Sequence, residues 1–355
     1  DRDMKEVYSN AIVLYGEDFE AVKGYVVVKD GVISEVGSGG YAGGAVDVKG
    51  GIIAPAFTNS HVHLGDSAGM DLGAYLPLEE RVGKKGLKWQ IHQRPDAKSA
   101  IMHVLDAMKK SGTTAFCDFR EGGIRGVGLL KPLLNMQARI LGRPDGHGDI
   151  MERCDGLGIS SIKDYSSEEL EGLLAKRSGR LIGIHAGEAR DDVLEALAIN
   201  PDFVVHLTNA GEESLREVFR RKIPIVLCPR ANASFGVGIP DLKAVFESGC
   251  TVALGTDNVM ANPPDMLREM EFSWKLYRGL YKDPEFDART ILKAATVNGR
   301  RILRLPDNTI EEGNRADFIV TRRFEHIRDP VLALVHRTSP SDIKKVLYPQ
   351  ASAIS

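Results

Sequence analysis

Two histidines separated by a single residue, His61 and His63, follow the apolar run 52–57. On an extended chain, residues i and i+2 project from the same face, so both imidazole rings can reach one ion. Imidazole nitrogens are common ligands of Zn²⁺, and less exclusively of Fe²⁺ or Mn²⁺. The pair is therefore one half of a candidate metal site.

Three further polar residues stand in similar places along the chain. His185 and His206 lie at or near the ends of two later apolar runs, and a third run leads into Asp257. A single histidine at a strand end is more often a hydrogen-bonded structural residue, and an aspartate there also suits a helix N-cap. The order His-x-His, His, His, Asp at successive strand ends favours one joint metal site.

The elements that must position these residues alternate in type. Short apolar runs are separated by helix candidates, which predicts parallel βα units. Neither G-x-G-x-x-G after the first strand nor G-x-x-x-x-G-K-[ST] occurs, so nothing marks a nucleotide site in an open sheet. Eight strands close a (β/α)8 TIM-type barrel, whose active sites lie at the carboxyl ends of the strands. The expected strands are 52–57, 113–119, 138–143, 156–162, 180–185, 202–207, 223–228 and 251–256.

Helix signals support the alternation. In 97–112, the apolar residues fall on one face at the 3.6-residue period, and Gly112 suits the C-terminal cap. The segment 166–179 opens with a serine cap and acidic residues and closes with basic residues and glycine.

Both ends of the chain have β character. Asp30-Gly31 between two Val/Ile-rich runs predicts a hairpin, and further strands are expected at 313–323 and 331–336. Too few to form a sheet alone, the late strands are expected to join the early ones. The predicted fold class is α/β, with a small discontinuous β-sandwich domain flanking the barrel. The predicted domains are 1–51 and 307–355 for the β domain and 52–306 for the barrel.

Composition excludes several classes of protein. With 46 Lys and Arg against 49 Asp and Glu, the net charge of −3 gives no support to nucleic-acid binding through a net basic field. No run approaches the ~18 apolar residues of a membrane span, and residues 1–10 lack the apolar core of a secretory signal. The four cysteines form no C-x-x-C pair. We expect a cytoplasmic protein with a small-molecule partner, and no nucleic-acid or membrane partner.

Several longer motifs carry a family resemblance that covers nearly the full length. They are GGIIAPAFTNSHVHLGD, HAGE, VVHLTNAGEESL, CPRANASFGVGIPDLKAVFESGCTVALGTDN, ATVNGRRIL and IEEGNRADFIV. Together they resemble the amidohydrolase superfamily of metal-dependent hydrolases. The nearest branch includes the cytosine, guanine and S-adenosylhomocysteine deaminases and the triazine chlorohydrolases.

The resemblance implies a set of metal ligands. His61, His63, His185 and Asp257 would hold one divalent ion, with zinc expected first and iron or manganese as alternatives. Such an ion lowers the pKa of a bound water towards ~7. A homodimer is expected from superfamily habit alone.

The resemblance also implies the acid–base groups of a deaminase. Asp257 would accept the proton of the attacking water, and His206 would orient that water or help to deprotonate it. Glu188 would protonate a ring nitrogen and then the leaving amine; it also suits the first turn of a helix. The implied reaction is hydrolytic deamination of an amino-substituted purine, pyrimidine, pterin or triazine.

Two alternatives stay open. Other members of the superfamily bind two metals bridged by a carbamylated lysine at the end of strand four, and Lys163 lies close to that place. With His206 as a second-metal ligand, that arrangement would indicate a cyclic amidase, dihydroorotase-like enzyme or imidopeptidase. The simpler interpretation of Lys163 is a solvated loop charge. The other alternative is a non-catalytic metal-barrel binding protein.

Four residues are expected to bind substrate. Trp89 and His92 lie in the long segment 64–96, Arg120 follows the second strand, and Asn232 follows the seventh. An aromatic ring can stack on a heterocycle, and a guanidinium can hold a carboxylate or phosphate. Each also has a structural interpretation, in which Trp89 packs the segment onto the barrel and Arg120 pairs locally. Nearby, Lys84, Lys85 and Lys88 are expected on a solvated face rather than against an anionic substituent.

Overall fold

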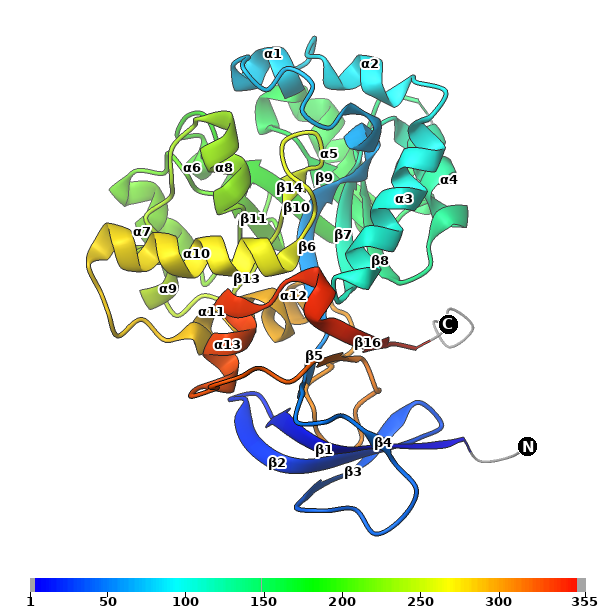
Figure 1. Cartoon of the computed structure of the whole chain (residues 1–355). Coiled ribbons are helices and arrows are strands. Elements are labelled where there is room, and N and C mark those ends of the chain that lie inside the picture. Colours follow the sequence, from blue (N-terminus) through cyan, green and yellow to red (C-terminus); the bar gives the residue numbers. More distant parts are fainter. Residues whose placement is uncertain (1–3, 148, 350–355) are drawn as a thin grey trace.

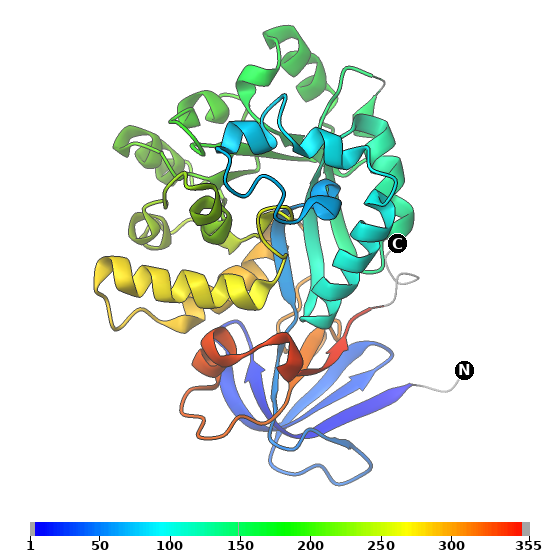
Figure 2. The same ribbon diagram turned by 45° about the horizontal axis from the view of Figure 1, so that its top comes forward.

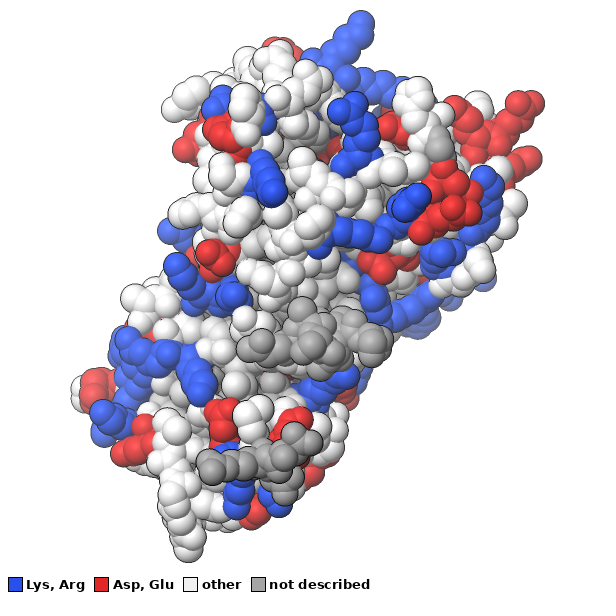
Figure 3. Space-filling view, turned by 90° about the vertical axis from the view of Figure 1, so that its right-hand side faces the viewer, with Lys and Arg blue, Asp and Glu red and all other residues white. Residues whose placement is uncertain are grey.

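The computed structural model describes residues 4–147 and 149–349, which contain two β-sheets. Figure 1 shows one sheet near both chain ends and the other in the middle of the chain, surrounded by helices. Within these residues, no helix combines the length and the apolar character that crossing a membrane requires. On the face shown in Figure 3, basic and acidic side chains are interspersed rather than gathered by sign.

The middle sheet is parallel throughout, with the strands in sequence order. Its strands are β6 (Phe57–His63), β7 (Thr113–Arg120), β8 (Gln137–Gly142), β9 (Gly156–Ile159), β10 (Leu181–Ala186), β11 (Phe203–His206), β12 (Ile225–Leu227), β13 (Val252–Leu254) and β14 (Asp257–Asn258).

The last two of these strands close the sheet into a ring. β13 pairs with β12, whereas β14 pairs with β6, and only two residues separate β13 from β14. In this gap, the amide of Thr256 donates to the carbonyl of His61 over 2.9 Å. A Cβ on Gly255 would lie 2.7 Å from the backbone nitrogen of His61, so only glycine allows this approach. Counting β13 and β14 as one interrupted strand, the predicted eight-stranded barrel is confirmed.

Alternate residues of the barrel strands pack in different directions, as the pleat requires. Cys117, Phe119 and Leu141 belong to one buried apolar cluster. Phe116 and Ile140, which precede Cys117 and Leu141, belong to the larger cluster shared with the helices. The ring of Phe119 lies 4.3 Å from that of His61. The first set therefore fills the barrel beneath the histidines.

Helices surround the barrel, as Figure 2 shows in an oblique view with the top turned forward. The predicted face of α3 is confirmed, since Ala97, Ile101, Val104, Leu105 and Met108 are its buried residues. The outer helices are α3 (Ala97–Lys110), α4 (Gly123–Leu130), α5 (Ser167–Ala175), α6 (Val193–Leu197), α7 (Glu212–Arg220), α8 (Pro229–Phe235), α9 (Leu242–Glu247), α10 (Met266–Tyr281), α11 (Ala288–Ala295) and α12 (Val297–Ile302).

The segment after β6 carries short helices across the carboxyl end of the barrel, shown in blue to cyan in Figure 2. They are the 3-10 helix η1 (Leu64–Gly69), α1 (Leu78–Val82) and α2 (Lys88–His92). The other 3-10 turns are η2 (Lys131–Leu133), η3 (Ile150–Glu152), η4 (Ile162–Asp164) and η5 (Pro340–Asp342).

Strands from both chain ends form the second sheet, as predicted. Its order is β16-β15-β5-β1-β2-β3, with β4 beside β1. Asp30 and Gly31 both have positive φ in the predicted hairpin, as a type I′ turn requires. The strands are β1 (Lys5–Tyr15), β2 (Glu20–Lys29), β3 (Val32–Ser38), β4 (Val46–Asp47), β5 (Ile52–Pro55), β15 (Phe318–Thr321) and β16 (Ile343–Leu347).

Two expected strands were wrong in detail. The run 52–57 is divided, because β5 pairs with β1 and β15 whereas the barrel strand β6 begins at Phe57. The run 331–336 is a helix, α13 (Pro330–Arg337), since Asp329 caps its first amides and proline suits its first turn. A continuous apolar run does not distinguish a buried strand from a buried helix. The domain boundaries 1–51, 52–306 and 307–355 stay a prediction.

Candidate metal centre and active site

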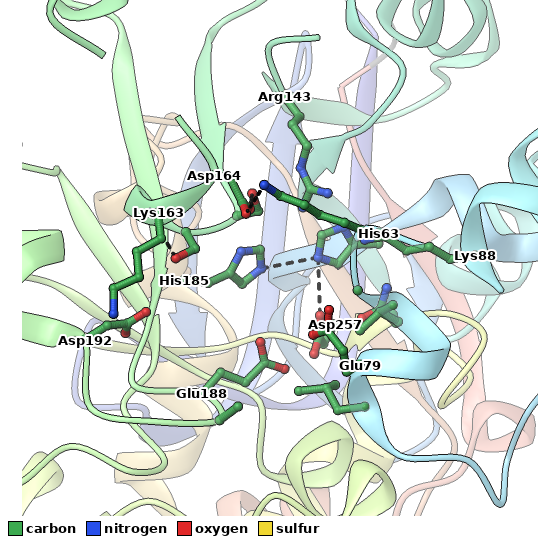
Figure 4. Close-up of a pocket in the computed structure, with 18 of the residues that line it drawn as sticks. His63, Glu79, Lys88, Arg143, Lys163, Asp164, His185, Glu188, Asp192 and Asp257 are labelled. Carbon is green, nitrogen blue, oxygen red and sulfur yellow. Dashed lines mark hydrogen bonds and ion pairs between the residues drawn. The ribbon is translucent and has the colours of Figure 1, made fainter. Parts of the chain in front are cut away.

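The carboxyl ends of four barrel strands bring the predicted site residues together. β6 supplies His61 and His63, β10 supplies His185, β11 ends at His206 and β14 begins at Asp257. All five are buried. Figure 4 shows His63, His185 and Asp257 converging at one side of a cavity.

The convergence is close. Nε2 of His185 lies 3.1 Å from Nε2 of His61 and 3.4 Å from Nε2 of His63. Oδ1 of Asp257 lies 3.3 Å from Nε2 of His61 and 3.4 Å from Nε2 of His63. Four potential ligand atoms thus face a common centre.

The opposite sides of two rings fix their protonation. Nδ1 of His63 lies 3.1 Å from the carbonyl of Phe119, and Nδ1 of His185 lies 3.2 Å from that of Ile159. A carbonyl only accepts, so each of these contacts requires a proton on Nδ1, and the neutral ring then carries its lone pair on Nε2. Lone pairs that point at one another are stabilised by a cation between them, as in metal centres.

The pKa values of His61, His185 and Asp257 suit a cation site. Burial lowers the pKa of His61 to about 4 and that of His185 well below its usual range, so both rings stay neutral. Burial opposes ionisation of Asp257, but the surrounding imidazoles, His61 foremost, outweigh it and lower the pKa of this carboxyl. Neutral imidazoles and an ionised carboxylate are the forms that bind metal.

His206 presents a different face. The side-chain amide Nδ2 of Asn232 donates to its Nδ1 over 3.1 Å, which places the ring proton on Nε2. That Nε2 lies 3.7 Å from Oε2 of Glu188 and 4.0 Å from Oδ2 of Asp257. Within the described chain, Nε2 of His206 and Oδ2 of Asp257 are buried without a hydrogen-bond partner. His206 therefore offers a donor beside the cluster.

Ligand atoms of His61, His185, His206 and Asp257 lie within 4.8 Å of one another. Both His206 and Asp257 have positive φ, at 86° and 61°. Such backbone is strained for residues other than glycine and recurs at functional sites. The strand ends are therefore bent to aim these two side chains.

Glu188 follows β10 and lines the same cavity. Its side chain points towards the cluster in Figure 4. Burial raises the pKa of Glu188, which favours the protonated form of this carboxyl.

The cavity has a volume of about 520 Å³, within the usual range for a small-molecule site. One side consists of the metal cluster, and the facing side consists of α1, α2 and the turn between them. The lining residues are His63, Leu78, Glu79, Val82, Gly83, Lys84, Lys88, Trp89, Arg143, Ser160, Ser161, Lys163, Asp164, His185, Glu188, Ala189, Arg190, Asp192, Asp257 and Asn258.

Of the four expected substrate-binding residues, the cavity lining includes Trp89 alone. His92 and Arg120 lie beside Gly65, where a Cβ would be 2.7 Å from Nε2 of His92 and 3.1 Å from Nη1 of Arg120. Asn232 contacts His206 instead. Their roles in substrate binding stay predictions.

Lys163 lies at the rim of the cavity, on η4 after β9, and is exposed. In Figure 4, its side chain extends towards Asp192 and away from His63 and His185. Ser160, directly after β9, lines the cavity. Ser160 lies two residues after Gly158, so both project from the same side of the chain. A Cβ added to Gly158 would lie 2.9 Å from the Phe119 ring. The strand-end position that faces the cluster thus carries a hydroxyl group.

Two residues of this site were missed. Oε1 of the buried Glu121 lies 2.8 Å from Nδ1 of His63 and 3.0 Å from Nζ of Lys88. The expected solvated face is wrong for Lys88, which is 3% exposed. A carboxylate directly after strand two, beside Arg120, was the available signal.

Comparisons with known proteins agree with this geometry. The profile described as "Amidohydrolase family" matches residues 52–347. A protein of Methanocaldococcus jannaschii is 32% identical over 368 residues, covering 93% of this chain and 94% of the relative. A 5-methylthioadenosine/S-adenosylhomocysteine deaminase of Thermococcus sibiricus is 27% identical, covering 89% of this chain and 85% of the relative.

One solved structure shows the likeness of fold. A zinc-bound adenosine deaminase from Xanthomonas campestris aligns with a TM-score of 0.75 at 17% identity, covering 97% of this chain and 91% of that chain. At this identity, the match bears on the architecture alone, and it agrees with the barrel described above.

Proposed function

The chain belongs to the amidohydrolase family, and we propose that it removes an amino group from a heteroaromatic ring by hydrolysis with one bound divalent cation. The observation that carries the proposal is the convergence of Nε2 of His61 and His185 with Oδ1 of Asp257, beside the carboxyl group of Glu188. The name of the deaminase relative supports the same reaction.

Zinc is the proposed cation, held by His61, His63, His185 and Asp257. Three imidazoles and one carboxylate are a donor set that zinc favours. The lone pairs facing the centre fit such an ion. When bound, the cation supplies Lewis acidity and makes a water molecule nucleophilic near neutral pH. Ser160, rather than a lysine, next to the end of β9 supports one ion instead of a bridged pair.

Asp257 and His206 act on the attacking water in this proposal. Oδ1 of Asp257 faces the imidazoles, which leaves the unpartnered Oδ2 to accept the proton of the water. His206 Nε2–H lies 4.0 Å from this oxygen and donates a hydrogen bond that orients the water. Asn232 keeps that proton on Nε2.

Glu188 acts on the substrate. In its protonated form, which burial favours, it donates to a ring nitrogen as water attacks the adjacent carbon. The resulting carboxylate then receives the proton held by Asp257 and passes it to the departing amine. The remaining proton of the added hydroxyl returns to Glu188 as the ring carbonyl forms, so water supplies the carbonyl oxygen, ammonia leaves and Glu188 is protonated again.

The substrate is proposed to be a small molecule carrying an aminopurine, aminopyrimidine, pterin or aminotriazine ring. The cavity of about 520 Å³ exceeds the needs of one such ring and leaves room for a substituent. Trp89 on its wall offers an aromatic side chain for contact with a ring. A homodimer and the absence of a nucleic-acid partner remain predictions.

Ammonia release tests the proposal. The chain reconstituted with Zn²⁺, Fe²⁺ or Mn²⁺ is screened against aminopurines, aminopyrimidines, pterins and triazines. We expect ammonia release from at least one ring class, at a rate about 10²- to 10⁴-fold lower in Glu188→Gln. Release of a ring-opened carboxylate or of chloride without ammonia would reject deamination within the same family.

A further inference from the structure

Glu121 directly follows β7 and is buried, at 2% exposure. One of its oxygens, Oε1, serves two partners: Nδ1 of His63 at 2.8 Å and Nζ of Lys88 at 3.0 Å. The other oxygen, Oε2, has no hydrogen-bond partner among the described residues. A single carboxylate oxygen therefore joins a proposed metal ligand to a lysine from another part of the chain.

Lys88 is the first residue of α2, in the segment that forms one wall of the cavity. Lysine is rarely buried unless its charge is paired. Arg143 also approaches Glu121, with Nη2 at 3.9 Å from Oε1, so the lysine shares its counter-charge. The contact with Glu121 is thus what allows α2 to lie with its first side chain inside the protein.

We propose that Glu121 is a positioning residue that couples occupation of the metal site to docking of residues 78–92 over the cavity. The proposal rests on the metal site of the proposed function and not on its substrate. The contact of Glu121 with Nδ1 of His63 was not among the roles predicted for the site residues.

The coupling has a direct physical basis. Glu121 and the Phe119 carbonyl share the Nδ1 proton of His63, which aims the Nε2 lone pair at the site. A cation held by His63 fixes this ring and with it the carboxylate that anchors Lys88. Linkage requires reciprocity: the factor by which metal stabilises docking equals the factor by which docking strengthens metal binding.

Four variants separate the contributions. Glu121→Gln keeps an acceptor at Oε1 and removes the charge, while Lys88→Met keeps most of the stem and removes the ammonium. Lys85→Met is the matched control, because Lys85 lies in the same segment, is exposed and is not among the residues that line the cavity. As a rescue, Lys88→Arg restores a cation at position 88.

Two measurements are made on each folded variant without substrate. Zinc affinity is determined by competition with a chromogenic chelator, and backbone amide exchange of residues 78–92 is followed by mass spectrometry with and without zinc. Zinc should slow this exchange in the unmodified chain. Glu121→Gln should weaken zinc binding by about 10- to 100-fold and abolish the slowing.

Lys88→Met should lose the zinc-dependent slowing of exchange. Its zinc affinity should fall by the factor by which zinc slows that exchange in the unmodified chain. Lys88→Arg should recover both, and Lys85→Met should match the unmodified chain. Exchange in 78–92 that zinc leaves unchanged in the unmodified chain would overturn the proposal, as would unaltered zinc affinity in Glu121→Gln. If the Glu121→Gln variant does not fold, the unmodified chain and the variants Lys88→Met and Lys88→Arg still test the proposal. Neither measurement requires turnover. A negative ammonia screen would therefore reject the proposed substrate and leave the coupling to be decided by zinc affinity and amide exchange.

Discussion

The side-chain amide of Asn232 donates to Nδ1 of His206 over 3.1 Å and thereby leaves the ring proton on Nε2, facing the site. The neighbouring His63 and His185 have the opposite tautomer, because backbone carbonyls contact their Nδ1 atoms. The histidines of the cluster thus divide by tautomer: Nε2 of His63 and His185 can accept a cation, whereas Nε2 of His206 carries a proton.

Replacing Asn232 by alanine should therefore lower kcat by about 100-fold, the lower end of what an acid–base group contributes. The zinc affinity should change little, since Nε2 of His206 is not among the proposed ligands. Steady-state kinetics and chelator competition measure the two effects. Ser234→Ala is the matched control on α8, where Ser234 is exposed; equal kcat in both variants would contradict the role of Asn232.

Glu188→Gln should lower kcat by about 10²- to 10⁴-fold, because the amide cannot transfer a proton to the ring. Zinc content should stay unchanged, because Glu188 is not among the proposed ligands and its Oε2 approaches His206. The exposed Glu195 on α6 supplies the control, Glu195→Gln. Full ammonia release by the Glu188→Gln variant would contradict the proposed role of Glu188 in proton transfer.

Chelation should abolish activity and lower stability, because buried lone pairs would face one another without a cation. At free zinc 1,000-fold above its Kd, binding stabilises the folded state by about 4 kcal/mol. Thermal unfolding with and without zinc measures the loss, and elemental analysis of the restored protein should find about one equivalent per chain. Two equivalents would contradict the single-cation site.

Lys163→Met should leave that single equivalent in place. The lysine is exposed and points towards Asp192 in Figure 4, so it contributes no ligand. Its position on the cavity rim permits a change in KM. Loss of tightly bound metal in this variant would support the alternative in which a carbamylated Lys163 bridges two metals.

A pH-dependent stability difference is expected at Glu269 of α10. Burial raises the pKa of Glu269 to about 7, despite the nearby guanidinium of Arg230 at 3.4 Å. Between its ordinary value of 4.5 and about 7, the folded state binds the proton that the unfolded state has lost. This group therefore makes the free energy of unfolding fall as pH rises through that window.

Glu269→Gln should flatten this decline, because the amide does not titrate. Urea unfolding at several pH values measures the difference between the two proteins. Parallel pH profiles would show that Glu269 has the same pKa in both states.

Much of the fold followed from local patterns. The buried face of α3 and the Asp30-Gly31 hairpin could be predicted, since apolar periodicity and turn residues act within a few positions. The run 331–336 could not, because an unbroken apolar stretch suits a buried strand or a buried helix, and the cap at Asp329 decided the outcome.

The sequence by itself determined which residues stand at the strand ends, because the H-x-H spacing and the alternation of elements are properties of the chain order. The resemblance to the amidohydrolase superfamily then selected His61, His63, His185 and Asp257 from them as the implied ligands. Only the tertiary structure decided the tautomer of His206 and the burial of Lys88 against Glu121. Those features depend on hydrogen bonds between residues 26 and 33 positions apart, whose partners no local spacing specifies.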